Sequence, residues 1–173
     1  ARPADRPPRL PDARRGPSGA ALGVTMCSGG RGGGDRTPAV EAARGVLASR
    51  WDREMTAGLR ALARMSLGIA ELWIGDLDAA SADLATGQAL ADEAANDSIR
   101  TTSQGWASLV HVAQGRLVEA ERAASAALLD AADHGWDADP HAAPAHVSLA
   151  TLALLWSDLD AANQQFTLAD SAG

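Results

Sequence analysis

The 173-residue sequence contains no lysine and no tyrosine, only one phenylalanine, and a single cysteine, Cys27. One cysteine cannot form a disulfide within the chain, which fits a reducing compartment such as the cytoplasm. With so few aromatic residues, a core has to be built mainly from leucine, alanine and the five tryptophans. Residues that favour strands are scarce, so the composition argues against a β-rich fold.

The sequence also lacks the apolar run of about 20 residues that a membrane-spanning helix needs. We expect no secretory signal, because no apolar segment follows the basic N-terminal residues. Without lysine, the chain cannot contain the Gly-x-x-x-x-Gly-Lys-Ser/Thr loop that binds nucleotide phosphates. The glycine-rich residues 28–34 follow no predicted strand, and we interpret them as a flexible linker.

Charge is distributed unevenly along the chain. Residues 1–36 carry seven arginines and three aspartates, a net charge of +4, whereas residues 37–173 carry eight arginines and nineteen acidic residues, a net charge of −11. An acidic domain is a poor match for a phosphate backbone, so we expect no direct nucleic-acid contact. The Pro-, Gly- and Arg-rich residues 1–36 have too little apolar surface to offset the entropy of ordering, and we expect them to be disordered.

Alanine is abundant, with 40 copies, and it is the best helix former and lets helices approach closely. Apolar residues recur at helical spacing, most clearly from Leu59 to Trp73. Thr37-Pro38 is a helix-opening signal, and Gly75-Asp76 ends one helix and caps the next. The sequence predicts helices at about 37–50, 51–74, 76–95, 101–114, 117–133, 144–156 and 159–171, with a turn at 96–98.

Three similar segments recur along the chain at offsets of 40 and 42 residues: GDLDAA from Gly75, GRLVEA from Gly115 and SDLDAA from Ser157. Such a period is typical of arrays of helical hairpins that bury their apolar faces against one another. Small residues recur 12 and then 7 positions apart, as close helix crossings require. These repeat positions are Gly68, Ala80, Gly87, Ser108, Ala120, Ala127, Ala150, Ala162 and Ala169. We predict an all-α chain with a linker or short helix at 37–56 and three hairpins at 57–173.

The spacing of these small residues resembles the tetratricopeptide (TPR) motif, with a longer period and without the usual closing proline. The segments Leu67–Ala80, His111–Glu121 and Pro144–Ala162 resemble the helical region of large LuxR-type transcriptional regulators similar to MalT. The resemblance implies a right-handed α-α superhelix of TPR-like hairpins. In those regulators such a region lies between an ATPase module and a helix-turn-helix, neither of which is visible in this sequence.

The function implied by the resemblance is that of a non-catalytic sensor or interaction region. Such arrays bind a protein or a small-molecule inducer on their concave face, which is lined by the first helix of each hairpin. On those helices, Glu71, Gln104 and His111 are the candidate partner-binding residues. A free-standing TPR adaptor that binds peptide segments is the alternative. We expect no cofactor and a cytoplasmic location, and an open apolar face after the last helix would be covered by a further segment or by a second copy in a homo-oligomer.

Two groups of residues allow other interpretations. A cluster near the sixth predicted helix could hold a metal in a helical hydrolase, although no HExxH motif or cysteine pair sets the geometry. That cluster is His134, Asp137, Asp139, His141 and His146. We interpret it as a polar loop. Trp73, Trp106, Trp136 and Trp156 are either anchors at a binding surface or fillers of the core.

Overall fold

The computed structural model describes residues 37–49 and 54–172. Within these residues every regular element is an α-helix, which confirms the all-α prediction. The disorder predicted for residues 1–36 falls outside the described residues. The helices are α2 (Thr37–Leu47), α4 (Ala57–Ile74), α5 (Leu77–Glu93), α6 (Asp97–Ala113), α7 (Leu117–Asp133), α8 (Ala143–Leu155) and α9 (Leu159–Ser171).

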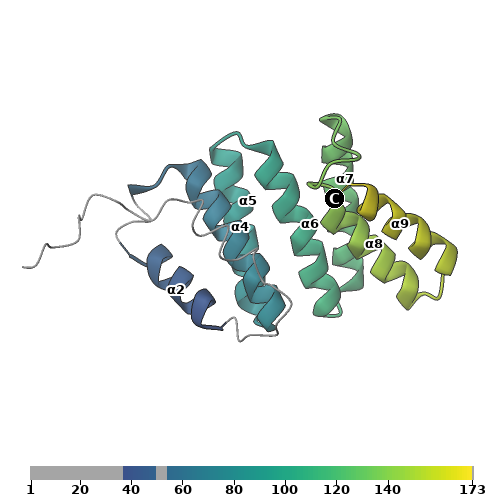
Figure 1. The fold of residues 1–173 in the computed structure, drawn as a ribbon, viewed down its shortest axis with the longest axis horizontal. Coiled ribbons are helices and arrows are strands. Elements are labelled where there is room, and N and C mark those ends of the chain that lie inside the picture. The colour runs from purple at the N-terminus through teal and green to yellow at the C-terminus, as the bar shows by residue number, and fades with distance from the viewer. Residues whose placement is uncertain (1–36, 50–53, 173) are drawn as a thin grey trace, which may run out of the picture.

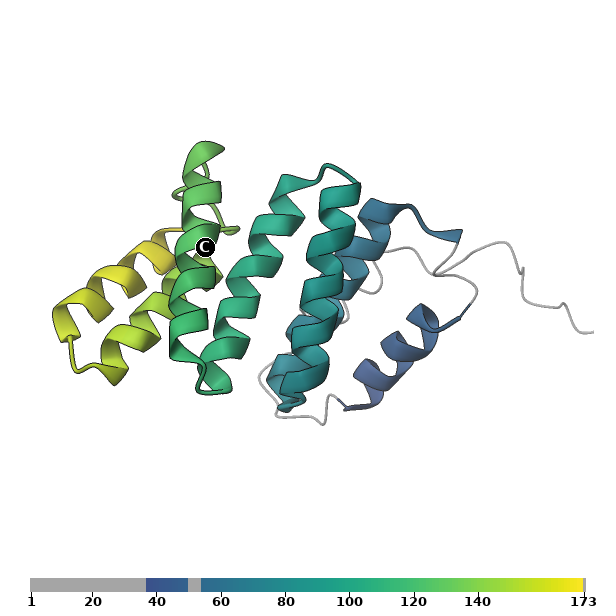
Figure 2. The same ribbon diagram turned by 180° about the vertical axis from the view of Figure 1, so that it is seen from behind.

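The helices pack as three hairpins, α4–α5, α6–α7 and α8–α9, preceded by α2. Figures 1 and 2 show them side by side along the long axis of the molecule in chain order. The three hairpin turns lie at one end of the helices, and the α5–α6 and α7–α8 connections lie at the other (Figure 1). Each first helix also contacts the first helix of the next hairpin. None of the described helices is long and apolar enough to cross a membrane.

The observed helix starts differ from the predicted ones where a side chain caps the helix. α6 begins at Asp97 rather than near residue 101, because Asn96 Oδ1 accepts a hydrogen bond from the backbone N–H of Ile99 at 3.2 Å. α4 begins at Ala57, after Thr56, whose hydroxyl caps it in the same way. The predicted turn at 96–98 is therefore a helix N-cap, which the same polar residues also favour.

Five helices end with the same backbone geometry, a single residue in the left-handed region. These residues are Gly75, Ala95, Gly115, Gly135 and Ser157. At each end the next N–H donates to a carbonyl five residues earlier, as Asp158 does to Ala153 at 2.9 Å. Glycine adopts this conformation freely, whereas a residue with a Cβ is strained by about 1–2 kcal/mol. The strain therefore falls on Ala95 and Ser157.

Small residues allow the two helices of a hairpin to cross closely. A Cβ added at Gly68 would lie 2.7 Å from Leu84 Cγ and 3.1 Å from the carbonyl oxygen of Ala80. One added at Gly87 would lie 3.1 Å from a backbone nitrogen of α4. Eight of the nine predicted repeat positions are buried, and the ninth, Ala169 in α9, is partly exposed. Larger side chains at the α4–α5 crossing would push the two backbones apart.

The same face of each first helix is covered by the preceding helix. α2 packs on Leu67 and Ala70 of α4, α5 packs on Val110 of α6, and α7 packs on Ala145 and Leu149 of α8. The offsets of 40 and 42 residues make Leu67 equivalent to Leu149, and Ala70 equivalent to Val110. α2 thus occupies on α4 the position that a second helix occupies in the later junctions.

Candidate functional site

Of the three predicted partner-binding residues, one is fully buried and two are partly buried. Glu71 is fully buried between α2 and α5, so its side chain does not lie on an exposed surface of this structure. Gln104 is partly buried on α6, and its repeat equivalent in α4, Arg64, binds Asp83 of the second helix α5 at 2.6 Å. The face on which Gln104 lies therefore points toward the second helices. The period placed these residues on first helices but could not say which way they point.

Glu71 belongs to an ionic cluster that fastens α2 to the first hairpin, and Arg44 of α2 is its centre. The Arg44 guanidinium donates to Glu71 Oε1 at 2.8 Å, to Asp76 Oδ2 at 2.5 Å and to Glu41 Oε1 at 2.8 Å. Burial raises the pKa of the Glu71 carboxyl to about 7, which Arg44 opposes and the nearby charge of Asp83 reinforces. The Arg44 guanidinium holds the pKa of Asp76 below its ordinary value.

His111 occupies the same repeat position in α6 that Glu71 occupies in α4. Its Nδ1 atom is buried and makes no hydrogen bond. Burial lowers the pKa of this imidazole, and the positive charge of Arg116 lowers it further. His111 is therefore a partly buried side chain that is neutral near neutral pH, and it does not present a charge to a partner.

An exposed aromatic surface lies on the opposite face of the first helices. On α4, residues 62, 66 and 73 lie about 120–160° around the helix from Gly68, which faces α5. Trp73 is 62% exposed, and its ring stands edge-on to that of Trp106 on α6, with centroids 6.4 Å apart. Trp106 also packs against the core of the first hairpin. This pair forms an apolar surface that spans two hairpins.

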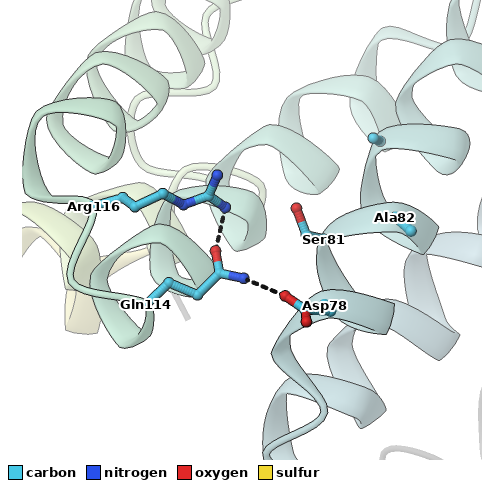
Figure 3. Close-up of a pocket in the computed structure, with 6 residues that line it drawn as sticks. Asp78, Ser81, Ala82, Gln114 and Arg116 are labelled. Atoms are coloured by element: carbon cyan, nitrogen blue, oxygen red, sulfur yellow. Dashed lines mark hydrogen bonds between the residues drawn. The ribbon is translucent and has the colours of Figure 1, made fainter.

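A polar hollow of about 620 Å³ opens between the start of α5 and the α6–α7 turn (Figure 3). Its lining residues are Asp78, Ser81, Ala82, Ala85, Gln114 and Arg116. The Gln114 amide donates to Asp78 Oδ1 at 3.4 Å and to the carbonyl of Leu77 at 3.3 Å. Arg116 in turn donates to the Gln114 side-chain oxygen. Figure 3 shows the three side chains in a row, with the arginine at one side and the aspartate at the other.

This row of side chains sets the chemistry of the hollow. Gln114 uses both its amide nitrogen and its oxygen, which fixes its orientation. Arg116 is exposed and has five N–H donors, of which Gln114 engages one. A carboxylate or phosphate fits beside Arg116, and an ammonium group or a peptide N–H fits beside Asp78. The hollow lining contains no histidine or cysteine, so Ser81 has no imidazole partner there that would activate it.

The histidines of the α7–α8 region are used in packing. The His134 ring stacks on Trp136 at 4.5 Å between centroids, and Trp136 contacts His141 at 5.5 Å. His141 Nδ1 lies 2.8 Å from Thr102 Oγ1 of α6. His146 Nδ1 lies 2.8 Å from Gln165 Oε1 of α9. In the described ranges 37–49 and 54–172, no three His, Cys, Asp or Glu side chains gather closely enough to hold a metal, so the geometry gives no support to the metal-site interpretation.

The candidate site therefore consists of the polar hollow and the Trp73–Trp106 surface. The hollow could not be found from the sequence, because it depends on how the α6–α7 turn sits beside α5. The repeat places Asp78 and Arg116 near equivalent turns, but it does not show that α5 and the α6–α7 turn lie side by side. Comparisons of the chain with protein-family models, with curated proteins and with solved structures gave no match.

Proposed function

We propose that this chain is a non-catalytic binding segment built of TPR-like hairpins wound into a right-handed superhelix. In this proposal it is the sensor region of a cytoplasmic MalT-like regulator of the LuxR family. The family assignment is supported by the three resembling segments at Leu67–Ala80, His111–Glu121 and Pro144–Ala162. The ligand is a protein or a small-molecule inducer, and binding changes the packing between hairpins, which biases a neighbouring domain.

The architecture is supported by features that a TPR-like array requires. Close crossing at Gly68 and Gly87 leaves no space for larger side chains. The three junctions, α2 on α4, α5 on α6 and α7 on α8, use equivalent faces of the first helices. An array of this kind transmits a change at one junction to the next, because each hairpin contacts only its neighbours.

One observation carries the binding function, namely the hollow that joins the first and second hairpins. It is lined by α5 on one side and by Gln114 and Arg116 on the other, so a ligand held there bridges two repeat units. Opposite charges at its two sides fit a ligand with both a carboxylate and an amino group. A ligand that binds one arrangement of the two hairpins more tightly shifts the population toward that arrangement.

A free-standing adaptor for peptide segments is the second candidate, and the exposed indole of Trp73 favours it. Tryptophan is enriched among the residues that dominate the energy of protein interfaces. A peptide that inserts a side chain beside Trp73 and Trp106 would lie across α4 and α6, and the hollow would not be required for its binding.

The two candidates are separated by the melting temperature of the full chain with defined ligands. The probes are free amino acids and dipeptides at millimolar concentration and, separately, N- and C-blocked peptides of about ten residues. We expect an amino acid or dipeptide to raise the melting temperature, because preferential binding to the folded state stabilises it. The rise should disappear in Arg116→Ala and in Asp78→Asn, and persist in Arg122→Ala, an exposed arginine on α7 outside the hollow.

Each other outcome has a defined meaning. A rise with blocked peptides alone that disappears in Trp73→Ala favours the adaptor. A rise with amino acids that survives in Arg116→Ala and Asp78→Asn contradicts the assignment of the hollow. If no probe changes the melting temperature of the wild-type chain, the proposal that the hollow binds a small ligand with a carboxylate and an amino group is wrong.

A further inference from the structure

Large apolar side chains are exposed at the last hairpin. Of the ten large apolar residues that are at least 36% exposed in the described chain, six belong to the α8–α9 hairpin. They are Leu154, Leu155, Trp156, Leu159, Phe166 and Leu168. Isolated exposed apolar residues need no explanation, but a contiguous set marks an interaction surface. We refer to Leu154, Leu159 and Phe166, together with Ala162 between them, as the α8–α9 face.

Equivalent positions in the three hairpins differ in how exposed they are. Phe166 is 40% exposed, whereas its equivalents Leu84 in α5 and Ala124 in α7 are fully buried. Leu159 is 69% exposed, whereas its equivalents Leu77 and Leu117 are partly buried. The same positions are thus covered in the first two hairpins and open in the third.

In both covered cases the occupant is a helix that follows the hairpin. α6 packs Trp106, Ala107 and Val110 against Ala80 and Leu84 of the first hairpin. α8 packs against the second hairpin, and Ala145 and Pro144 lie close to Gly105 of α6. At the first junction the occupying surface is one face of α6, on which Trp106 lies beside the smaller side chains of Ala107 and Val110.

A polar contact accompanies the apolar packing at the end of the occupying helix. At the first junction, Gln114, just after α6, donates to Asp78 and to the carbonyl of Leu77. The equivalents on the third hairpin are Asp160 and Leu159, both exposed. Charged residues around the α8–α9 face are acidic only: Asp158, Asp160 and Asp170, and the sequence has no arginine after Arg122. The acidic rim complements an occupant with donor or basic groups, and it opposes two-fold pairing of this face with a second copy.

We propose that the α8–α9 face is a docking site for an amphipathic helix of a protein partner. The helix carries small or apolar residues at positions i, i+4 and i+7 and a basic or amide side chain at i+11. On α6, Ala107 and Val110 pack against the first hairpin and Gln114 donates to it, and the fully buried Ser103 lies one turn before Ala107 on the same side of the helix. The site is distinct from the polar hollow and binds by helix packing, with Asp160 as the acceptor for the donor at i+11.

The test uses the full chain and a probe of defined sequence, a fluorescein-labelled peptide of residues 97–116 with Arg in place of Gln114. Fluorescence anisotropy measures its affinity. We expect Leu159→Asp to weaken binding at least about tenfold, since a buried charge replaces an apolar contact. Asp160→Asn should weaken binding by about two- to fivefold, and less for the peptide that keeps Gln114.

The matched control is Leu129→Asp on α7, because Leu129 is 69% exposed, as is Leu159, but lies outside the face. It should change the affinity less than about twofold. Circular dichroism checks that each variant is folded, and Leu159→Gln serves if Leu159→Asp is not. Equal loss of binding in the Leu129 and Leu159 variants, or no detectable binding to the wild-type chain, overturns the proposal. So does a wild-type dimer in sedimentation velocity that becomes monomeric with Leu159→Asp, because the occupant is then a second copy.

Discussion

The first and last hairpins have similar sequences at equivalent positions, yet their surroundings differ. The α4–α5 hairpin is covered by α2 on one side and by α6 on the other. The α8–α9 hairpin packs against α6 and α7 but leaves Leu159 and Phe166 exposed. Equivalent repeat positions therefore lie on equivalent faces of their helices, whereas the neighbouring unit decides whether that face is buried. In an array of this kind, the contacts between neighbouring units contribute to the free energy of unfolding together with the contacts within each hairpin.

The two hairpins also differ in how their helices are tied together by polar groups. At equivalent positions, the first hairpin uses the ion pair between Arg64 and Asp83, at 2.6 Å, and the third uses the His146–Gln165 contact, at 2.8 Å. The first hairpin alone has the additional cluster around Arg44. Its stability should therefore depend on pH through the buried carboxyl group of Glu71, whose equivalent in the last hairpin is Ala153.

The largest expected effect comes from truncating the same repeat position in the two hairpins. Leu84→Ala removes a fully buried side chain at the α4–α5–α6 junction, and we expect a loss of about 3 kcal/mol in the free energy of unfolding. Phe166→Ala removes a side chain that is 40% exposed, and we expect a loss of about 1 kcal/mol or less because the described helices leave much of it open to solvent. Urea denaturation followed by circular dichroism measures both.

A helical array can unfold in parts, so the slopes of the two denaturation curves have to be compared with that of the wild-type chain. Equal losses for the two variants would mean that Phe166 is covered in solution, and the contrast between the hairpins would fail.

The next effect concerns the cluster that holds α2. Arg44→Met removes the cation that pairs with buried Glu71, and we expect a loss of about 2–3 kcal/mol at pH 8. The folded-state pKa of Glu71, about 7, is above its ordinary value of 4.5. Its stabilising contribution is therefore full below pH 4.5 and is lost as the pH rises through 7.

Removing Arg44 raises the pKa of Glu71 further, because the arginine lowers it in the wild-type chain. The stability difference between wild type and Arg44→Met should therefore be larger at pH 8 than at pH 5. Burial lowers the pKa of His111, so its contribution to the folding stability is lost as the pH falls below 6.5. This contribution is the same in both proteins and cancels in the difference. Arg122→Met on the exposed face of α7 is the control and should cost little at either pH. A difference that is independent of pH would show that Arg44 does not shift the pKa of Glu71 within this pH range.

The features predicted from sequence are those that depend on neighbouring residues along the chain. Helix periodicity, glycine-containing helix ends such as Gly75, and small residues at crossings such as Gly68 are local consequences of helix geometry. The burial of Glu71 depends in part on α2, whose Arg44 binds it from 27 residues earlier in the sequence. The hollow depends on the position of the α6–α7 turn relative to α5, and no spacing within either element encodes it. A first-helix residue therefore cannot be assigned to an open face from the period alone.

The smallest effect tests the turns of the same two hairpins. Gly75 and Ser157 occupy equivalent left-handed positions, with φ of 82° and 61°, and both are exposed. Ser157→Gly should stabilise the chain by about 0.5–1 kcal/mol, because relief of strain exceeds the extra freedom that glycine gives the unfolded chain. Gly75→Ser should destabilise it by a similar amount, as measured by urea denaturation. A Cβ at position 75 would meet no other group within 4 Å, and Ser157 is exposed. The two changes should therefore be equal and opposite although one hairpin is covered and the other open. A much smaller gain at Ser157 would mean that the last hairpin frays before the rest of the array unfolds, because strain in a segment that is already open does not affect the global transition.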